Sequence, residues 1–232
     1  MKTHALTGAT SGIGAVLARE LSQRGDGLVL LARSKAKATA LTADFPRAQV
    51  LVADLADPGT LNGLGRQVDG PVHSLVHLAG VVELAPVSRL RLHDWEEQLA
   101  VNLTSPAVLT REFLPHLRES RGTVVFVNSS AGLTANAEWS AYAASKFGLR
   151  AFADALRAEE VEHGTRVTTI YPSRTATPMQ EKVHEQEGRV YDKSRWISPE
   201  TVVSTILHAL DLPPDATIPD VTVRPTAPRP GT

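Results

Sequence analysis

The sequence predicts an α/β fold, a doubly wound parallel sheet of about seven strands with helices on both faces. Short apolar runs alternate with longer segments whose apolar residues recur at helical spacing. Several runs, such as Leu28–Leu31 and Val124–Val127, are continuously apolar, which is typical of strands buried on both faces of a parallel sheet. This β-α-β alternation implies right-handed crossovers between parallel strands.

The elements are expected in the following order. The strands are His4–Thr7, Gly27–Ala32, Gln49–Ala53, Ser74–Leu78, Thr123–Asn128, Arg166–Tyr171 and Val221–Arg224, and the clearest helices are Ile13–Arg24, Asp94–Arg118 and Ala141–Glu162. The polar segment Pro178–Ser198 interrupts the alternation, and it is either a lid over a site or a mobile loop. Without repeats or Gly/Ser linkers, we expect one domain over residues 1–232, with a loose tail at Pro225–Pro230.

Composition narrows the class of protein. The 232 residues are 42% hydrophobic and 21% charged, which is globular composition. No cysteine is present, which excludes disulfides and thiolate metal sites. The net charge of -1 argues against a nucleic-acid partner, and no apolar run reaches the ~18 residues of a membrane span. Since Met1 to His4 lead directly into the first strand, leaving no room for a signal peptide, we expect a cytoplasmic protein.

A glycine-rich segment connects the first expected strand to the first expected helix. It reads Thr7-Gly8-Ala9-Thr10-Ser11-Gly12-Ile13-Gly14. Glycines permit the tight turn and let the backbone approach a pyrophosphate, while the helix N-terminus supplies free N–H groups and a partial positive charge. The segment lacks the Gly-Lys-Ser/Thr ending of a nucleoside-triphosphate loop, so we predict a dinucleotide site.

The end of the second strand indicates which dinucleotide binds. An acidic residue there would bond the ribose 2′-hydroxyl and repel a 2′-phosphate. This chain has Ala32 followed by Arg33, whose guanidinium can fork onto a phosphate, and Ser34 and Lys35 add donors. We therefore predict NADP(H) as the preferred cofactor, with NAD(H) as the alternative. The competing interpretation of Arg33 is a solvated surface residue.

A second motif carries acid–base chemistry. Tyr142 and Lys146 are four residues apart, which places them on one face of a helix. A free tyrosine has a pKa near ~10, and a nearby ammonium favours the phenolate and lowers that pKa. Ser129 stands at the end of an apolar strand, where the ligand crevice of an open α/β sheet lies. Asn102 lies within the long helix that precedes that strand.

Taken together, these residues resemble the short-chain dehydrogenase/reductase family, with a Rossmann-type fold, over essentially the whole chain. The resemblance rests on the glycine segment, Asp54-Leu55, Ala79-Gly80, Asn102, Ser129, Tyr142-x3-Lys146 and Pro172 through Thr177. It implies hydride transfer between a nicotinamide cofactor and a carbonyl or secondary alcohol. It also implies a homodimer or homotetramer built on the two longest helices.

The resemblance also assigns roles. The implied catalytic residues are Asn102, Ser129, Tyr142 and Lys146. Asn102 would hold a water in a proton relay, and Ser129 would hydrogen-bond the substrate oxygen. Tyr142 would be the general acid/base, and Lys146 would hold the nicotinamide ribose and lower the pKa of Tyr142. The implied cofactor-binding residues are Gly8, Thr10, Ser11, Gly12, Ile13, Gly14, Arg33, Ser34, Asp54, Leu55, Ala79, Gly80, Tyr142, Lys146, Pro172, Thr175 and Thr177. No metal is expected, because His73 and His77 lie roughly 13 Å apart if they share a strand.

Three departures from the family pattern and two alternative functions remain. His77-Leu78-Ala79-Gly80 replaces the usual Asn-Asn-Ala-Gly, and Pro172-Ser173 replaces Pro-Gly. Ser130 is an alternative to Ser129, but the Ser-x2-Gly spacing and the distance to Tyr142 favour Ser129. Because Ser173 stands where the family has glycine, that loop must avoid a glycine-only conformation. The alternatives are a dinucleotide-binding sensor without turnover, which would be expected to lack Tyr142 or Lys146, and an epimerase or dehydratase of the same fold.

Overall fold

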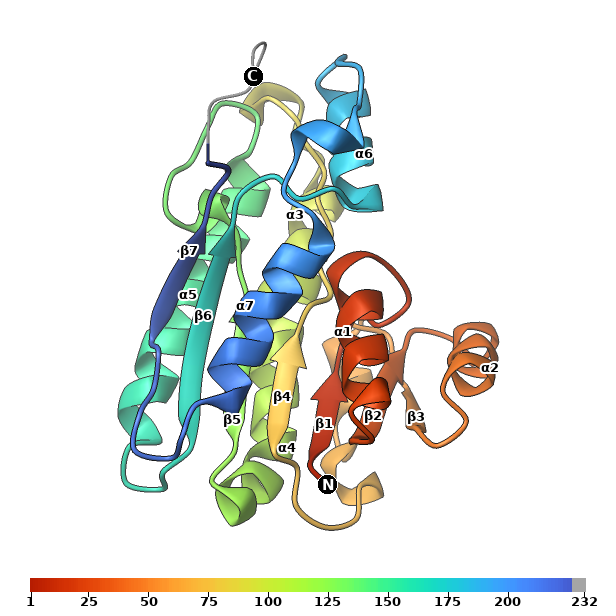
Figure 1. Ribbon diagram of the computed structural model, residues 1–232. Helices are drawn as coiled ribbons and strands as arrows, with labels where there is room; N and C mark the ends of the chain where they lie inside the picture. The colour runs from red at the N-terminus through yellow and green to blue at the C-terminus, as the bar shows by residue number, and fades with distance from the viewer. Residues whose placement is uncertain (227–232) are drawn as a thin grey trace.

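The computed structural model describes residues 1–226, in which seven parallel strands form one sheet in the order β3-β2-β1-β4-β5-β6-β7 (Figure 1). The strands are β1 (Thr3–Leu6), β2 (Gly27–Ala32), β3 (Gln49–Val52), β4 (Ser74–His77), β5 (Thr123–Val127), β6 (Arg166–Pro172) and β7 (Asp220–Val223). Every neighbouring pair is parallel. The predicted doubly wound parallel sheet is confirmed, and the expected strand ends are correct to within a residue.

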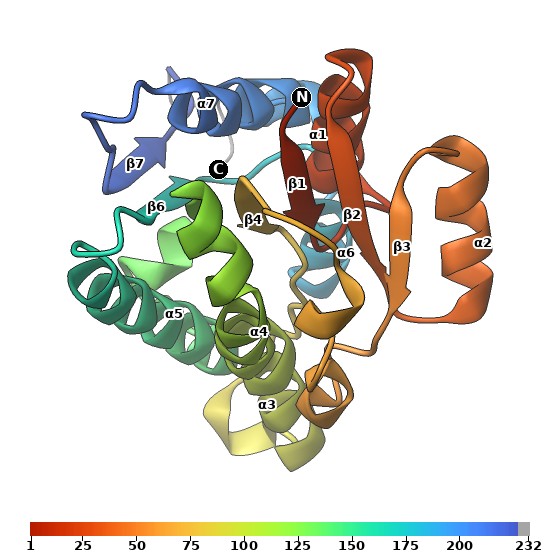
Figure 2. The ribbon, with the colours of Figure 1, turned by 90° about the horizontal axis from the view of Figure 1, so that it is seen from below.

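The helices cover both faces of this sheet. They are α1 (Gly12–Gln23), α2 (Lys35–Asp44), α3 (Leu92–Leu99), α4 (Ser105–Ser120), α5 (Ser140–Glu159), α6 (Pro178–Gln186) and α7 (Pro199–Asp211). Figure 2 shows α1 and α7 on one face, α3, α4 and α5 on the other, and α2 beyond the β3 edge. Two separate apolar cores lie on the two faces of the sheet.

The continuous apolar runs are explained by these two cores. In β5, Val124 and Phe126 pack into the core beneath α4 and α5, whereas Val125 and Val127 pack into the core beneath α1 and α7. Successive side chains of a strand point to opposite faces, so a strand that is covered on both sides has no polar face. All five residues of β5 are accordingly buried.

One predicted helix is interrupted. The segment predicted as a single helix, Asp94–Arg118, consists of α3, a π-helical turn at Ala100–Thr104, and α4. Pro106 lacks the N–H that would bond the carbonyl of Asn102 in a regular α-helix, which accounts for the break at this point. Such π turns are frequent at functional sites, and this one carries Asn102.

The segment over residues 178–198 is structured. It consists of α6 followed by a 3-10 turn at Lys193–Arg195, and a β-bridge between Thr175 and Ile197 closes its base. It lies at the carboxyl ends of the strands (Figure 1). Most of the tail predicted to be loose, Pro225–Pro230, falls outside the described residues.

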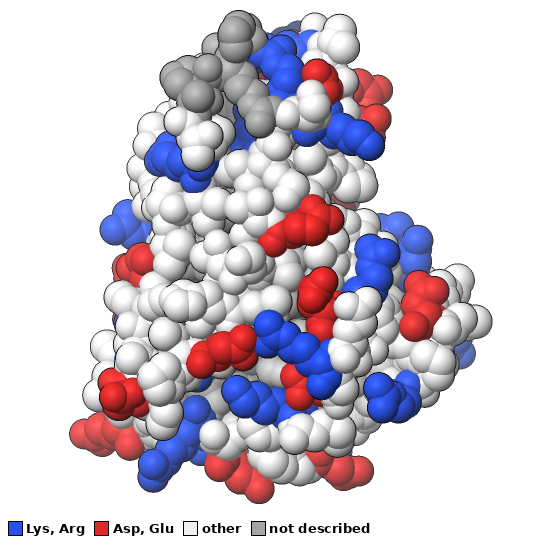
Figure 3. Space-filling view, in the orientation of Figure 1, with Lys and Arg blue, Asp and Glu red and all other residues white. Residues whose placement is uncertain are grey.

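The surface carries both signs of charge. Figure 3 shows basic and acidic side chains interspersed over one face of the molecule. Within residues 1–226, no helix is both long enough and apolar enough to cross a membrane.

Two histidines are buried in the sheet. His4 Nδ1 lies 2.7 Å from Ser74 Oγ, and its Nε2 lies 3.4 Å from Asp26. Burial lowers the pKa of His4 to about 4, although Asp26 opposes the change. His77 stacks on Phe126 with ring centroids 5.0 Å apart, and full burial lowers its pKa to about 3. No group of three metal-ligating side chains occurs among the described residues.

These histidines predict loss of stability in acid. The unfolded chain protonates them near pH 6.5, whereas the folded protein does so only near pH 4 for His4 and near pH 3 for His77. The unfolded state therefore binds more protons in this interval, and the free energy of unfolding falls as the pH falls below 6.5. We expect a loss on the order of 3 kcal/mol per histidine by pH 4, measured by urea denaturation.

Replacement of one histidine checks this assignment. His77→Asn should lessen the dependence of the free energy of unfolding on pH, whereas His208→Asn, on the exposed side of α7, should retain it. A wild-type pH dependence in the His77 variant would contradict the assignment.

Candidate active site

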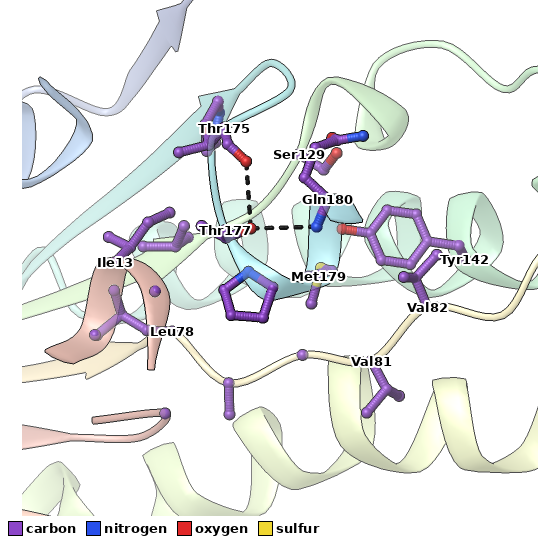
Figure 4. A pocket seen from close by; sticks show the side chains of 18 of the residues that line it. Ile13, Leu78, Val81, Val82, Ser129, Tyr142, Thr175, Thr177, Met179 and Gln180 are labelled. Carbon is purple, nitrogen blue, oxygen red and sulfur yellow. Dashed lines mark hydrogen bonds between the residues drawn. The ribbon is translucent and has the colours of Figure 1, made fainter. Parts of the chain in front are cut away.

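A cleft of about 960 Å³ opens at the carboxyl ends of the strands. It lies where the chain order of the sheet reverses between β1 and β4, which is the usual ligand site of doubly wound sheets. Its walls come from the glycine segment, the loops that follow β2 to β6, and α6. Figure 4 shows Ile13, Leu78, Tyr142 and Thr177 around it.

The glycine segment forms one end of the cleft. Gly8 has φ +72°, and a Cβ there would lie 2.8 Å from the backbone nitrogen of Ala79. A Cβ on Gly14 would lie 2.2 Å from the carbonyl oxygen of Gly8. The turn between β1 and α1 therefore has no room for a side chain at Gly8 or Gly14. The predicted residues of this segment all line the cleft, namely Gly8, Thr10, Ser11, Gly12, Ile13 and Gly14.

Thr7 is a contributor that the sequence did not single out. Its hydroxyl oxygen accepts hydrogen bonds from the backbone N–H groups of Leu78 and Ala79, each at 3.0 Å. These bonds join the end of β1 to the end of β4. The predicted residues Ala79 and Gly80 line the cleft directly beside this junction.

A basic corner lies at the ends of β2 and β3. Arg33, Asp54 and Leu55 line the cleft as predicted, but Ser34 does not. Its hydroxyl instead caps α2 by accepting a bond from the backbone N–H of Lys37 at 3.3 Å. Lys35 also points elsewhere, whereas Lys37 lines the cleft. The sequence could have indicated Lys37, because serine is a preferred N-cap residue and Ser34 at that position places Lys37 in the first turn of the helix.

The acid–base residues converge at the middle of the cleft. Ser129 follows β5, and Tyr142 and Lys146 lie one turn apart on α5. Ser129 acts on Tyr142 by favouring its ionised form, which lowers the pKa of the phenol, whereas Ser130 has no such effect on it. Lys146 Nζ lies 5.7 Å from the centre of the Tyr142 ring and donates to the carbonyl of Val127 at 3.3 Å. All three side chains line the cleft.

Burial dominates the electrostatics of this group. It raises the pKa of Tyr142 to about 12, with the Ser129 hydrogen bond acting in the opposite direction. It lowers the pKa of Lys146 to about 8. The sequence predicted a lower pKa for Tyr142, and this prediction is wrong for the protein without cofactor, because burial raises the pKa of the phenol more than the Ser129 hydroxyl lowers it.

Asn102 holds the loop after β4. Its side-chain oxygen accepts from the N–H of Val81 at 2.9 Å, and its amide donates to the carbonyl of Val81 at 2.9 Å and to Ser145 at 3.1 Å. The side chain is buried and does not line the cleft. The amide is thus engaged within the protein, and the expected water relay stays a prediction.

Asn128 joins the end of β5 to α5, and the sequence did not single it out. Its side-chain oxygen accepts from the N–H of Ser129 at 2.8 Å, and its amide donates to the carbonyl of Lys146 at 3.0 Å. A Cβ on Gly132 would lie 2.5 Å from the Asn128 oxygen, so glycine is required there. This one side chain therefore connects Ser129 at the end of β5 to Lys146 on α5.

The loop after β6 completes the cleft. Thr177 caps α6 by accepting from the N–H of Gln180 at 3.3 Å, and its hydroxyl donates to the carbonyl of Thr175 at 3.2 Å (Figure 4). Pro172, Thr175 and Thr177 line the cleft as predicted. Arg121 and Glu138 are the described non-glycine residues with positive φ, so Ser173 needs no glycine-like conformation.

A family model for short chain dehydrogenases matches residues 2–188. The chain belongs to this family. An uncharacterized oxidoreductase of Listeria monocytogenes is 30% identical, with 96% of this chain and 95% of the Listeria protein covered. A short chain dehydrogenase from Escherichia coli complexed with NADPH is 25% identical, with a TM-score of 0.85 and 97% of each chain covered. A 4-hydroxyisoleucine dehydrogenase complexed with NADH is also 25% identical, with a TM-score of 0.84, 96% of this chain and 97% of that protein covered.

This short-chain dehydrogenase also has an apolar patch beside Tyr142. The patch joins the loop after β4, the turn after β5, the start of α5, and α6; its residues are Val82, Leu84, Ala131, Trp139, Tyr142, Met179 and Val183. Trp139 meets Tyr142 edge to face with ring centroids 5.7 Å apart. Most of these residues are far apart in sequence, so spacing alone could not have grouped them.

The bridging role of Asn128 predicts a large effect on folding. Asn128→Ala leaves the Ser129 N–H without its partner and removes the additional bond to the Lys146 carbonyl, which lies within α5. We expect the free energy of unfolding to fall by about 1–3 kcal/mol, measured by urea denaturation. Asn62→Ala, at an exposed position, should change it by less than about 0.5 kcal/mol. Equal effects of the two substitutions would contradict the bridging role.

Proposed function

We propose that this short-chain dehydrogenase transfers a hydride between NADP(H) and a carbonyl compound or secondary alcohol. The observation that carries the proposal is the convergence of Ser129, Tyr142 and Lys146 in the same cleft as the glycine segment. A proton donor, a hydrogen-bond donor and a dinucleotide cradle are the parts that carbonyl reduction needs.

The residues present fit a dinucleotide. Gly8 and Gly14 leave the space that a Cβ would fill, so the backbone can approach a pyrophosphate. Ser11 begins α1 without a side-chain cap, which leaves the first N–H groups of the helix for the phosphates. Lys146 is placed to hold the nicotinamide ribose, and Thr175 and Thr177 to meet the nicotinamide itself.

The bound nicotinamide supplies hydride to the carbonyl carbon in reduction and accepts it from the alcohol in oxidation. As charge develops on the substrate oxygen, Ser129 donates a hydrogen bond to it and Tyr142 donates its proton. Reduction thus consumes one hydride and one proton, and Tyr142 regains its proton from solvent. The raised pKa of Tyr142 keeps the phenol protonated at neutral pH, which suits reduction.

NADP(H) is favoured over NAD(H) by the basic corner. Arg33 and Lys37 line the cleft at the end of β2, where an acidic residue would be needed to bond a ribose 2′-hydroxyl. The acidic residue that lines the cleft at the end of β3, Asp54, accepts a hydrogen bond from the N–H of Ala56 at 3.0 Å. A structural relative complexed with NADPH agrees with this preference, and another complexed with NADH keeps NAD(H) as the alternative.

A homo-oligomer built on α4 and α5 is part of the proposal. Phe147 on α5 is 41% exposed, and Ala151, Ala155 and Ala158 of the same helix are also exposed. An exposed aromatic side chain on the outer face of a long helix is suited to contact between subunits.

Replacing Tyr142 tests the reaction class. Tyr142→Phe removes the phenolic proton and leaves the ring, so kcat for carbonyl reduction should fall by about a hundredfold or more. NADPH binding, measured by fluorescence titration, should be retained. Retained turnover in this variant would reject Tyr142 as the general acid, and NADPH binding without turnover in the wild type would favour a dinucleotide-binding sensor.

Charge reversal tests the cofactor preference. Arg33→Asp should lower the ratio of kcat/KM for NADPH over NADH by at least about tenfold, because a carboxylate repels the 2′-phosphate. Lys37→Gln should lower this ratio in the same direction. Lys35→Gln, outside the cleft, is the matched control and should leave it unchanged. A wild-type ratio in the Arg33 variant would show that Arg33 does not contact the phosphate.

A further inference from the structure

The end of the cleft beyond Tyr142 is rich in arginine. Arg174 follows β6, Arg189 and Arg195 belong to the segment after α6, and Arg224 follows β7; all four line the cleft. The acidic residues that line the cleft are Asp54, at the end of β3, and Glu97, on α3. Neither belongs to the segments that carry the four arginines, although Glu187, outside the lining of the cleft, pairs with two of them.

Arg174 is occupied within the protein. Its guanidinium forks onto the Glu187 carboxylate with N–O distances of 2.8 and 2.5 Å. It also stacks between Trp139 and Trp196, at 5.9 and 5.6 Å from their ring centres. Burial alone would raise the pKa of Glu187, but the arginine outweighs it and the pKa is lowered. Arg189 approaches the same carboxylate, at 3.9 Å.

Arg195 differs from Arg174. Its Nη2 is buried and has no hydrogen-bond partner. No described carboxylate lies within 4.0 Å of its guanidinium nitrogens, the distance that defines an ion pair. The indole nitrogen of the next residue, Trp196, is also buried and unpartnered. A buried donor without an acceptor costs free energy that a ligand oxygen would recover. Two such donors, adjacent in the chain and on residues that line the cleft, indicate an acceptor that the protein itself does not supply.

These donors lie on the substrate side of the cleft. Trp196 stacks on Arg174, Arg174 stacks on Trp139, and Trp139 meets the ring of Tyr142. The basic corner formed by Arg33 and Lys37 is at the opposite end, beyond the glycine segment. The apolar patch that contains Tyr142 includes Met179 and Val183 of α6, and Trp196 meets His184 of the same helix with ring centroids 5.0 Å apart.

We propose that the substrate is a carbonyl compound bearing a carboxylate, separated from the carbonyl by an apolar segment, and that Arg195 binds this carboxylate. A guanidinium presents two parallel N–H donors that match the two oxygens of a carboxylate. The apolar patch contacts the segment between the two groups while Tyr142 and Ser129 hold the carbonyl oxygen. This inference rests on the proposed function, since it names the substrate class of the same site.

Matched acid and ester substrates test the proposal. The probes are 4-oxopentanoate, 5-oxohexanoate and 6-oxoheptanoate, each beside its methyl ester, with NADPH. For at least one chain length, the wild type should show a kcat/KM for the acid at least about tenfold above that for the ester. In Arg195→Gln this acid-to-ester ratio should fall at least about tenfold, mainly through KM. Lys193→Gln, on the same turn and outside the cleft, is the matched control and should keep the wild-type ratio.

Two further measurements separate the possible failures. NADPH titration of Arg195→Gln reports whether the variant is folded, and an NADPH Kd weakened tenfold in a protein that still unfolds cooperatively would assign Arg195 to the cofactor and overturn the proposal. Calorimetric titration of the acids and esters into the NADP⁺ complex needs no turnover. Acid binding that requires Arg195 would support the proposal even without turnover, whereas esters reduced or bound as well as the acids would overturn it and leave the proposed function intact.

Discussion

The junction between the ends of β1 and β4 is the constraint on which the site depends. There the backbone of the glycine segment touches the backbone at Ala79, and Thr7 bonds the two N–H groups that follow β4. Strands on either side of this junction lead to helices on opposite faces of the sheet, so their loops diverge and leave a cleft between them. A Cβ on Gly8 or Gly14 would push the two ends apart.

The acid–base group is built on a second junction, between β5 and α5. Asn128 bonds one residue of the strand end and one residue of the helix, and Ser145 bonds both the Tyr142 carbonyl and Asn102. Hydrogen bonds from buried side chains to the backbone therefore help to fix the spacing of Ser129, Tyr142 and Lys146. The same burial that makes the group rigid also penalises the charged forms of Tyr142 and Lys146, so the pKa of Tyr142 rises and the pKa of Lys146 falls.

The segment around α6 combines a firm attachment with unpaired donors. Gln186 bonds both the Leu84 N–H and the Glu83 carboxylate, and Lys182 pairs with Glu83 at 2.8 Å. On the other side, Arg174 and Glu187 join the segment to the end of β6. Polar groups in this region are paired with few exceptions, which makes the unpartnered Nη2 of Arg195 and indole nitrogen of Trp196 more informative than exposed groups would be.

The sequence by itself determined the sheet, the glycine segment and the pairing of Tyr142 with Lys146. Those features depend on local pattern: alternating faces of a strand, glycine in a tight turn, and two residues one helical turn apart. The tertiary structure alone decided that Asn128 bridges strand and helix, and that Val82, Trp139 and Val183 join one apolar patch beside Tyr142. It also decided the direction in which the pKa values of Tyr142 and Lys146 shift. Burial and long-range contacts set each of these, and neither is encoded in the spacing of residues along the chain.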